Sequence, residues 1–280
     1  MALLAALVLQ AASEEAIRRL IEQLSSDRIE ARSEAYRKLE DIGRPALALL
    51  QKAALDPDDE VASRARTLVV RIPIREHLTP ALIAVGGIYD RLALGDWTPV
   101  FLDLSADLRQ GDDRRRYPGV RADDLSFMAP MAIASAKTEA DKVAVCQAVG
   151  RMQLKSAIPS VLPLLRDAQA TVRSNAIAAI RDTNARDQVA AVRPSLTDPS
   201  NLVRTVAAHA LGRLGDQECV PQLIAMLEDD NANVRWWAVY ALGELRPPTA
   251  AEAIAPLKDD PNDFVRRVAR ETWSQLRQKP

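Results

Sequence analysis

The feature that most constrains this chain is a phrase that recurs every 31 residues. A Val-Arg pair begins at positions 172, 203, 234 and 265, and an alanine follows at positions 176, 207, 238 and 269. An aspartate precedes each pair at the same spacing. A fixed period of about 20 to 50 residues is typical of solenoids, in which each unit packs only against its neighbours. The period therefore predicts a repeat solenoid before any single helix is considered.

The amino-acid composition indicates which secondary structure the chain favours and which classes of partner it disfavours. Hydrophobic residues make up 48% of the 280 residues and aromatic residues only 4%, which favours close-packed helices over sheets. Lys and Arg number 37 against 38 Asp and Glu, so the basic excess of a nucleic-acid-wrapping protein is missing. No stretch approaches the roughly 18 to 20 apolar residues that cross a membrane. We expect Cys146 and Cys219, which stand in different repeats, to be buried free thiols.

The helical patterns predict about eight helix pairs that form one solenoid over residues 13–280. The array is regular over residues 138–276, and the first half carries blurred pairs over 13–72, with a helix end at Gly43. Pro159 and Pro221 fit the first turn of a helix. We expect the regular pairs at 156–166 with 170–182, 187–196 with 201–214, 218–228 with 232–245, and 249–258 with 262–276.

Residues 73–121 depart from this regularity. We expect one helix over residues 79–94, with a soft point at its two adjacent glycines, and another over 97–110. Residues 111–121 combine turn formers with dense charge, which predicts a surface loop. We expect the three arginines at 114–116 in that loop to be solvated.

Residues 1–12 form an apolar N-terminal segment with two interpretations. It resembles the core of a cleaved signal peptide, although no Lys or Arg stands ahead of it. It also fits a helix that caps the first repeat. The protein is exported in the first case and cytoplasmic in the second.

The recurring residues have structural roles in the expected array. The alanines let neighbouring helices approach closely, and Ile or Leu at positions 180, 211 and 242 fills the layer between repeats. Each aspartate is expected to cap the following helix. Each arginine, six residues later, is expected to reach the neighbouring repeat's aspartate or turn carbonyls. These residues form a predicted ladder: Asp167, Arg173, Asp198, Arg204, Asp229, Arg235, Asp260 and Arg266.

An Asp turn followed by Val-Arg-x-x-Ala-x-x-Ala-Leu-Gly resembles the HEAT repeat. The resemblance is close over residues 138–276 and looser over 13–72, and the 31-residue spacing is similar to that of the short HEAT-like repeats of phycobilin lyases. It implies an all-α fold, a right-handed α-solenoid of helical hairpins. It also implies that the second helix of each pair lines the concave face, and that the array serves as a protein-binding scaffold.

Three classes of protein that are similar to HEAT arrays have other activities, and the chain can be compared with each of them. Deoxyhypusine hydroxylases carry repeated His-Glu metal pairs, whereas His77 and His209 are the only histidines here and neither is followed by Glu. Two unpaired histidines cannot build such a di-iron site. Phycobilin lyases stay an alternative, because residues 235–240 have the aromatic character of their repeats. DNA-glycosylase-like arrays need a basic, aromatic-lined groove, which Trp236 and Arg267 allow but the charge balance argues against.

The candidate partner surface is one face of the second helices. The residue after each motif arginine, and those four and eight positions later, share a face because four residues advance a helix by about 400°. We expect this row to be exposed and concave: Ser174, Ala178, Asp182, Thr205, His209, Arg213, Trp236, Tyr240, Glu244, Arg267, Glu271 and Gln275. Trp and Tyr are enriched in contact hot spots. The candidate partner-binding residues are therefore His209, Arg213, Trp236, Tyr240, Glu244, Arg267 and Glu271.

Two expectations concern the tryptophans of this surface. In a purely structural alternative, Trp236 packs on Arg267 or Arg204 of the adjacent repeats. Trp237 aligns with Asn175, Val206 and Val268, so we expect it to be more buried and structural.

The sequence predicts a monomeric, non-catalytic scaffold that binds another protein on its concave face without a cofactor. No Gly-rich phosphate loop, Cys-pair metal spacing or Ser/His/Asp arrangement stands out in the sequence. One alternative is a lyase or chaperone that acts on a pigment-bearing or other prosthetic-group protein. Another is a nucleic-acid-binding HEAT-like protein, which the charge balance disfavours.

Overall fold

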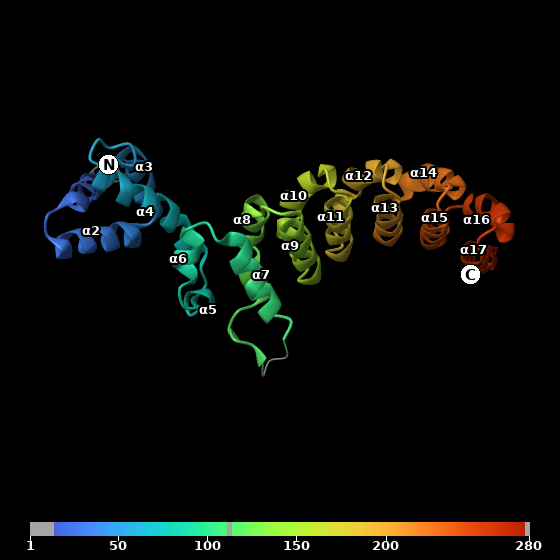
Figure 1. Ribbon diagram of the computed structural model, residues 1–280, viewed down its shortest axis with the longest axis horizontal. Helices are drawn as coiled ribbons and strands as arrows, with labels where there is room; N and C mark the ends of the chain where they lie inside the picture. The colour runs from blue at the N-terminus through green and yellow to red at the C-terminus, as the bar shows by residue number, and fades with distance from the viewer. Residues whose placement is uncertain (1–13, 111–113, 278–280) are drawn as a thin grey trace, which may run out of the picture. The chain divides into compact units, whose positions relative to one another are not determined.

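The computed structural model describes residues 14–110 and 114–277 of the chain. These residues form helices and turns without a strand, so the all-α solenoid expected from the sequence is confirmed (Figure 1). The chain divides into two compact units between Asp96 and Trp97. One continuous array over residues 13–280 stays a prediction. The apolar segment at residues 1–12, with its two interpretations, lies outside the described residues.

The N-terminal unit consists of helices packed around one hydrophobic core. Leu24, Leu39, Leu50 and Leu68 are completely buried in it. Asp58 caps the longest helix by accepting hydrogen bonds from two backbone N–H groups. The elements after the helical residues 14–22 are η1 (Gln23–Ser25), α2 (Ile29–Ile42), α3 (Arg44–Ala53), α4 (Asp59–His77), α5 (Pro80–Ile83) and α6 (Ile88–Ala93).

The helix expected over residues 79–94 is in fact two short helices, α5 and α6. The expected soft point at the two glycines is a full break, because Gly87 adopts a left-handed conformation with φ of 73°. A residue without a Cβ reaches this region at no steric cost. Gly43 ends α2 in the same region of φ, at 71°, as the sequence predicted.

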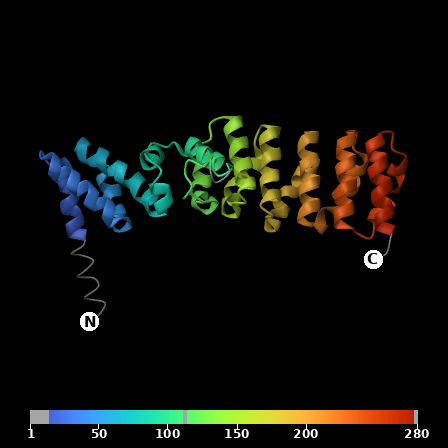
Figure 2. The same ribbon diagram turned by 90° about the horizontal axis from the view of Figure 1, so that it is seen from below.

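The C-terminal unit begins with a less regular pair and continues as a two-layer array. Its less regular part contains α7 (Trp97–Asp107), η3 (Ala122–Leu125) and α8 (Met128–Ser135). The long helices of the array then lie side by side in one layer (Figure 2), and each packs against the next. We call it the second-helix layer: α9 (Glu139–Arg151), α11 (Ala170–Asp182), α13 (Asn201–Leu214), α15 (Ala232–Leu245) and α17 (Asp263–Arg277).

The first helices of the regular pairs form the other layer, and they are shorter than expected. Each expected helix is divided into one short α-helical segment and one or two 3-10 segments. Pro163, Pro194 and Pro256 lie in the first turns of three of these 3-10 segments. Proline lacks the N–H that would continue an α-helix. The segments are η4 (Lys155–Ala157), α10 (Ile158–Val161), η5 (Leu162–Arg166), η6 (Arg186–Gln188), α12 (Val189–Val192), η7 (Arg193–Thr197), η8 (Gln217–Cys219), α14 (Val220–Ala225), η9 (Met226–Glu228), α16 (Ala250–Ile254) and η10 (Ala255–Asp259).

The core between the layers follows the 31-residue register. The recurring valines, alanines and the Ile or Leu column are completely buried: Val172, Ala176, Ile180, Val203, Ala207, Leu211, Val234, Ala238, Leu242, Val265 and Ala269. Complete burial of a Val, Ile or Leu side chain stabilises a fold by about 1.5–3 kcal/mol. Cys146 and Cys219 are free and buried in the same core, as expected.

The arginine run at 114–116 is only partly solvated, in contrast to the expectation. The carboxylate of Asp107, at the end of α7, is almost completely buried and accepts the backbone N–H groups of Arg116 and Tyr117 at 2.8 and 3.1 Å. Arg115 and Arg116 also form ion pairs with Asp107. The buried carboxylate therefore holds the start of the loop, and Arg115 is the half-buried member of the run, whereas Arg114 and Arg116 are exposed.

Candidate functional site

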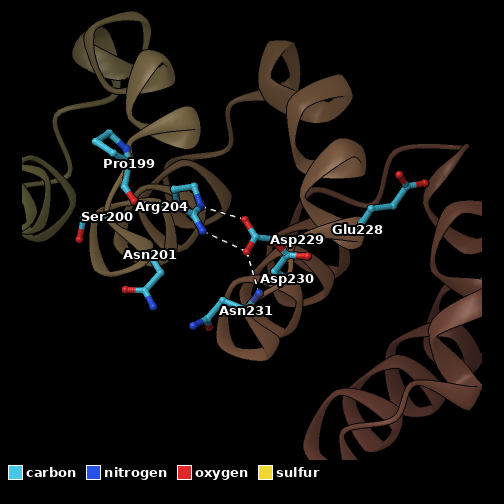
Figure 3. A pocket seen from close by; sticks show the side chains of 8 residues that line it. All are labelled: Pro199, Ser200, Asn201, Arg204, Glu228, Asp229, Asp230 and Asn231. Atoms are coloured by element: carbon cyan, nitrogen blue, oxygen red, sulfur yellow. Dashed lines mark hydrogen bonds and ion pairs between the residues drawn. The ribbon is translucent and has the colours of Figure 1, made fainter.

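A ladder of charged side chains joins the turns of successive repeats along one edge of the C-terminal unit. Figure 3 shows the rung between Arg204 and Asp229. The guanidinium donates from Nε and Nη2 to the two carboxylate oxygens of Asp229, at 2.8 and 3.0 Å. Its Nη1 donates to the carbonyl oxygen of Asp198 at 2.9 Å. Arg204 therefore ties its own turn to the turn of the next repeat with a bidentate, charge-assisted bond.

The same geometry recurs through the regular repeats. Arg173 binds Asp198, and Arg235 binds Asp260, with the same pairs of atoms at 2.7 to 2.9 Å. The ladder also extends one repeat further back than the sequence showed. There Lys142 stands in the arginine column and its Nζ lies 2.7 Å from Asp167. At the other end, Arg266 donates to the carbonyl of Asp260 and pairs with Asp263.

The ladder aspartates do not cap the following helices, which corrects that expectation. Each accepts instead the N–H of the residue two positions later; for Asp229 that residue is Asn231. The caps of α15 and α17 come from asparagines, since Asn231 and Asn262 accept N–H groups of the first helical turn. The capping residue therefore lies two positions after the aspartate that the repeat pattern had suggested as the cap.

The arginine partners keep the ladder carboxylates ionised. The hydrogen bond from Arg235 lowers the pKa of Asp260, against the opposing effect of its burial. Burial is the largest single effect on Asp198 and Asp229 and raises their pKa values. The hydrogen bonds from Arg173 and Arg204, the backbone hydrogen bonds and the nearby arginine charges together exceed it, so both pKa values are lowered. The turn hollow of about 530 Å³ beside Arg204 and Asp229 is lined by groups that mostly serve these rungs (Figure 3).

An aromatic cluster on the second-helix layer is the main candidate site. It consists of His209 on α13 and Trp236, Trp237 and Tyr240 on α15. His209 and Trp237 are stacked with ring centroids 4.3 Å apart. Trp236 and Tyr240 are stacked at 5.7 Å, and Trp237 meets both of these rings edge-on at 4.7 and 5.3 Å. All four side chains are partly exposed, so the aromatic cluster presents a fixed, amphipathic surface.

The imidazole of His209 is neutral and held in one tautomer. Arg181 on α11 places Nη1 3.1 Å from Nδ1 of His209. A guanidinium can only donate, so Nδ1 accepts and the ring proton lies on Nε2. Burial, followed by the charges of Arg181 and Arg213, lowers the pKa of His209 to about 4, although Asp182 opposes the shift. The site therefore spans three adjacent repeats, from Arg181 through His209 to Trp237.

The structure brings together some of the predicted partner-binding residues. His209, Trp236 and Tyr240 are in direct contact within the aromatic cluster. The remaining four lie on the same layer and are exposed: Arg213, Glu244, Arg267 and Glu271. The guanidinium of Arg267 lies over the ring of Phe264 at 6.0 Å, and Trp236 stacks on Tyr240. Trp236 therefore packs within its own helix, not on Arg267 or Arg204 as the structural alternative expected.

Three residues of this surface need comment. Trp237 is partly exposed, as Trp236 is, and the imidazole of His209 stacks on its ring, so its greater burial stays a prediction. Ser174 is buried and donates to the carbonyl of Thr171, although it belongs to the expected exposed row. Arg181 was missed because it occupies a position where glycine stands in the next two repeats, at 212 and 243. Only that departure from the repeat could have marked it.

Over residues 14–110 and 114–277, no group of three or more His, Cys, Asp and Glu side chains is arranged to hold a metal ion. Within the same residues, no helix is both long and apolar enough to cross a membrane.

Comparisons with known proteins concern the repeat fold. No curated protein sequence matches the chain. Similar solved structures include human deoxyhypusine hydroxylase in complex with glycerol, at 18% identity over 95% of this chain and 98% of that chain, with a TM-score of 0.37. They also include YibA of E. coli, at 17% identity over 92% of both chains with a TM-score of 0.44. A third is the CpcE–CpcF complex of phycocyanin lyase from Nostoc sp. PCC7120, at 17% identity over 93% and 94% with a TM-score of 0.34. At these values the likenesses carry no argument about function.

The family match is more informative. A family model described as HEAT repeats matches residues 130–212 and 189–273, which together span more than half of the chain. The match falls on the helix pairs that carry the ladder and the aromatic cluster. The chain therefore belongs to the HEAT-repeat family.

Proposed function

We propose that this protein is a non-catalytic scaffold that binds a partner protein on the second-helix layer, with the aromatic cluster at the centre of the interface. One observation carries the proposal. Two adjacent repeats hold Trp236, Trp237, Tyr240 and His209 in one cluster of ring contacts while leaving all four partly exposed. Large aromatic side chains that are already fixed lose little conformational entropy when a partner covers them.

The surroundings of the aromatic cluster fit an interface. The exposed charges of Arg213, Glu244, Arg267 and Glu271 lie on the same layer, and they have both signs. A rim of mixed charge around an aromatic centre is the usual anatomy of a protein interface. Figure 1 shows the layer on the inner side of the curve of the C-terminal unit, where one partner can contact several repeats.

The test is a double substitution, Trp236→Ala with Tyr240→Ala, in the full-length protein. Hot-spot truncations each cost about 2 kcal/mol or more of binding free energy, so we expect affinity for a partner isolated from the native host to fall at least a hundredfold. Circular dichroism and thermal melting should stay near wild type, because both rings are partly exposed.

The matched control is Trp273→Ala, which removes a tryptophan from another helix. Trp273 lies on α17 between the cations of Lys258 and Arg277, at 4.0 and 4.7 Å, and outside the aromatic cluster. This variant should bind the partner normally. Normal binding by the double variant, or unfolding of it, would contradict the placement of the interface.

A second candidate function is a lyase or chaperone for a prosthetic-group protein. The flat, stacked surface of the aromatic cluster would also suit a conjugated planar ligand. A spectroscopic titration with free bilin separates the two functions. Stoichiometric binding that the double variant abolishes would favour the lyase or chaperone. Unchanged bilin spectra together with loss of partner capture would favour the scaffold.

A further inference from the structure

The N-terminal unit contains a pocket that plays no part in the proposed interface. It has a volume of about 600 Å³, which is within the range of about 300–1,000 Å³ typical of small-molecule sites. Helices α2 and α4 form one side, and the segment from Leu78 to Asp90 forms the other. The pocket therefore lies wholly within one unit, and its geometry does not depend on the second-helix layer.

A hydrogen-bonded network forms the polar wall of this pocket. Glu40 is its centre, with a side chain only 12% exposed. Its carboxylate accepts from Arg71 Nε at 3.1 Å and from the hydroxyl of Tyr89. The Arg71 guanidinium lies 4.0 Å over the ring of Tyr89 and donates to Asp90 at 2.8 Å. These contacts fix the wall before any ligand enters, which lowers the entropic cost of binding.

The charges of the pocket do not cancel within the network. Arg71 and Arg75 pair with Glu40, Asp41 and Asp90, so two cations face three anions and leave a surplus of one negative charge. Arg37 also lines the pocket, one helical turn before Glu40. Its guanidinium forms no ion pair with the pocket carboxylates, and its charge acts on the exposed Glu34 on the same helix. The pocket thus has one surplus negative charge in its network and, one helical turn away, a guanidinium outside that network.

The opposite wall is aliphatic. Leu78, Val85 and Ile88 are buried beneath it, and the side chain of Ile83 is 59% exposed at its surface. An exposed isoleucine beside a polar pocket leaves apolar area that a ligand can cover, and removing that area from water favours binding.

We propose that this pocket binds a zwitterionic α-amino acid with a branched aliphatic side chain. The ligand's carboxylate pairs with Arg37 in a bidentate, charge-assisted bond. Its ammonium group donates to the surplus carboxylate of the network, with Asp41 as the exposed member nearest to Arg37 in the helix. Its side chain covers Ile83. A ligand with only a negative charge lacks an ammonium group that could pair with the acidic network. A ligand with only a positive charge lacks a carboxylate that could pair with Arg37.

The experiment measures binding of L-leucine to the full-length protein by calorimetry and by chemical-shift changes of the backbone amides. N-acetyl-L-leucine, which lacks the ammonium group, and L-leucinamide, which lacks the carboxylate, are the blocked probes. A lost hydrogen bond to a charged group costs about 1.5 kcal/mol or more, so each blocked probe should bind about tenfold more weakly or worse. The shifts should be confined to residues 37–90.

Matched substitutions assign each contact. Arg37→Ala should weaken L-leucine about tenfold and leave the weaker binding of L-leucinamide unchanged. The control is Lys38→Ala, which removes the adjacent exposed cation that pairs with Glu34 outside the pocket. Ile83→Ala should weaken L-leucine severalfold, whereas Ile29→Ala, at an exposed isoleucine elsewhere on the unit, should not.

Several results would overturn the proposal. They are the absence of any response to millimolar L-leucine, equal binding of a blocked probe, and equal effects of Arg37→Ala and Lys38→Ala. All of these variants are at exposed positions, and circular dichroism verifies that each is folded. None of them touches the aromatic cluster, so the outcome does not depend on the proposed interface.

Discussion

The imidazole of His209 lies between two basic side chains and stacks on Trp237, and this environment sets its protonation. Because burial and the two arginines lower its pKa to about 4, the ring stays neutral throughout the neutral range. The unfolded ring, with a pKa of about 6.5, binds a proton at pH values where the folded ring does not. The free energy of unfolding should therefore fall as the pH drops from about 6.5 to 4, and His209 contributes no further loss below that range.

This prediction is checked by following the His209 ring proton by NMR and the unfolding free energy of wild type and His209→Gln. The ring should titrate near pH 4, and the substitution should remove part of the decline between pH 6.5 and 4. A ring that titrates near pH 6.5 in the folded protein would show that Arg181 and burial do not act as described.

The ladder residues give a second prediction at the residue scale. Arg235→Ala leaves the carboxylate of Asp260, itself only 7% exposed, without its bidentate partner. Loss of a largely desolvated charge pair should lower the free energy of unfolding by about 2–4 kcal/mol at pH 7. Arg266→Ala is the matched control, because Arg266 holds turn carbonyls and the exposed Asp263. The free energy of unfolding should fall less for Arg266→Ala than for Arg235→Ala. Denaturant unfolding measures both changes.

The pH dependence of the ladder follows from the lowered pKa of Asp260. The pair stabilises the fold above the unfolded aspartate pKa of about 3.9, and the contribution is lost as the pH falls through the lower folded value. The difference between wild type and Asp260→Asn should therefore be constant from pH 7 to about 5 and shrink below about pH 4. A difference that persists at pH 2 would assign the effect to packing instead of charge.

At the scale of helices, close approach depends on a glycine in the second-helix layer. A Cβ on Gly212 of α13 would lie 2.9 Å from the Cα and 3.0 Å from the Cβ of Ala241 on α15. Backbone cannot move aside as a flexible side chain can, so Gly212→Ala must separate the two helices. Overpacking should lower the free energy of unfolding by about 1–3 kcal/mol. This loss equals or exceeds the gain of about 1 kcal/mol from the higher helix propensity of alanine.

The control for this substitution is Gly86→Ala in the N-terminal unit. Nothing lies within 4 Å of a Cβ at Gly86, and its φ is not positive. We expect this variant to be neutral or stabilised by about 0.4–1 kcal/mol, because alanine restricts the unfolded chain. Equal stability changes for the two glycines, measured by denaturant unfolding, would show that α13 and α15 are not in close contact at Gly212.

At the scale of the whole molecule, the division between Asp96 and Trp97 predicts that the units can be separated. The C-terminal unit contains its own buried columns of Val, Ala and Leu and its own ladder. Residues 97–280 alone should therefore be helical and unfold cooperatively, with the same pattern of protected amides as in the full chain. Hydrogen exchange of the two proteins is the measurement. An unprotected fragment would mean that its core requires residues 1–96.

The repeat register explains which parts of the fold were predictable. The expected second helices at 170–182, 201–214 and 232–245 agree with α11, α13 and α15 at both ends, because each turn repeats the same residues at the same step. The valine and alanine columns are buried for the same reason. The exposed face with His209, Trp236 and Tyr240 also follows from helix periodicity. These features depend on local patterns, and the sequence alone determined them.

Other features depend on contacts between repeats, and they became visible in the folded protein alone. The left-handed residue that ends four second helices is Gly215 in one repeat but Gln153, Asn184 and Arg246 in the others, so no residue type marks the position. The stacking of Trp237 on His209, and the bond from Arg181 that sets the tautomer of His209, each join residues 28 positions apart in adjacent repeats. The pocket between Arg37 and Ile83 likewise requires α2, α4 and the broken segment after α4 to meet. Helix periodicity specifies which side chains share a face, but the packing of one repeat on the next determines which of them meet.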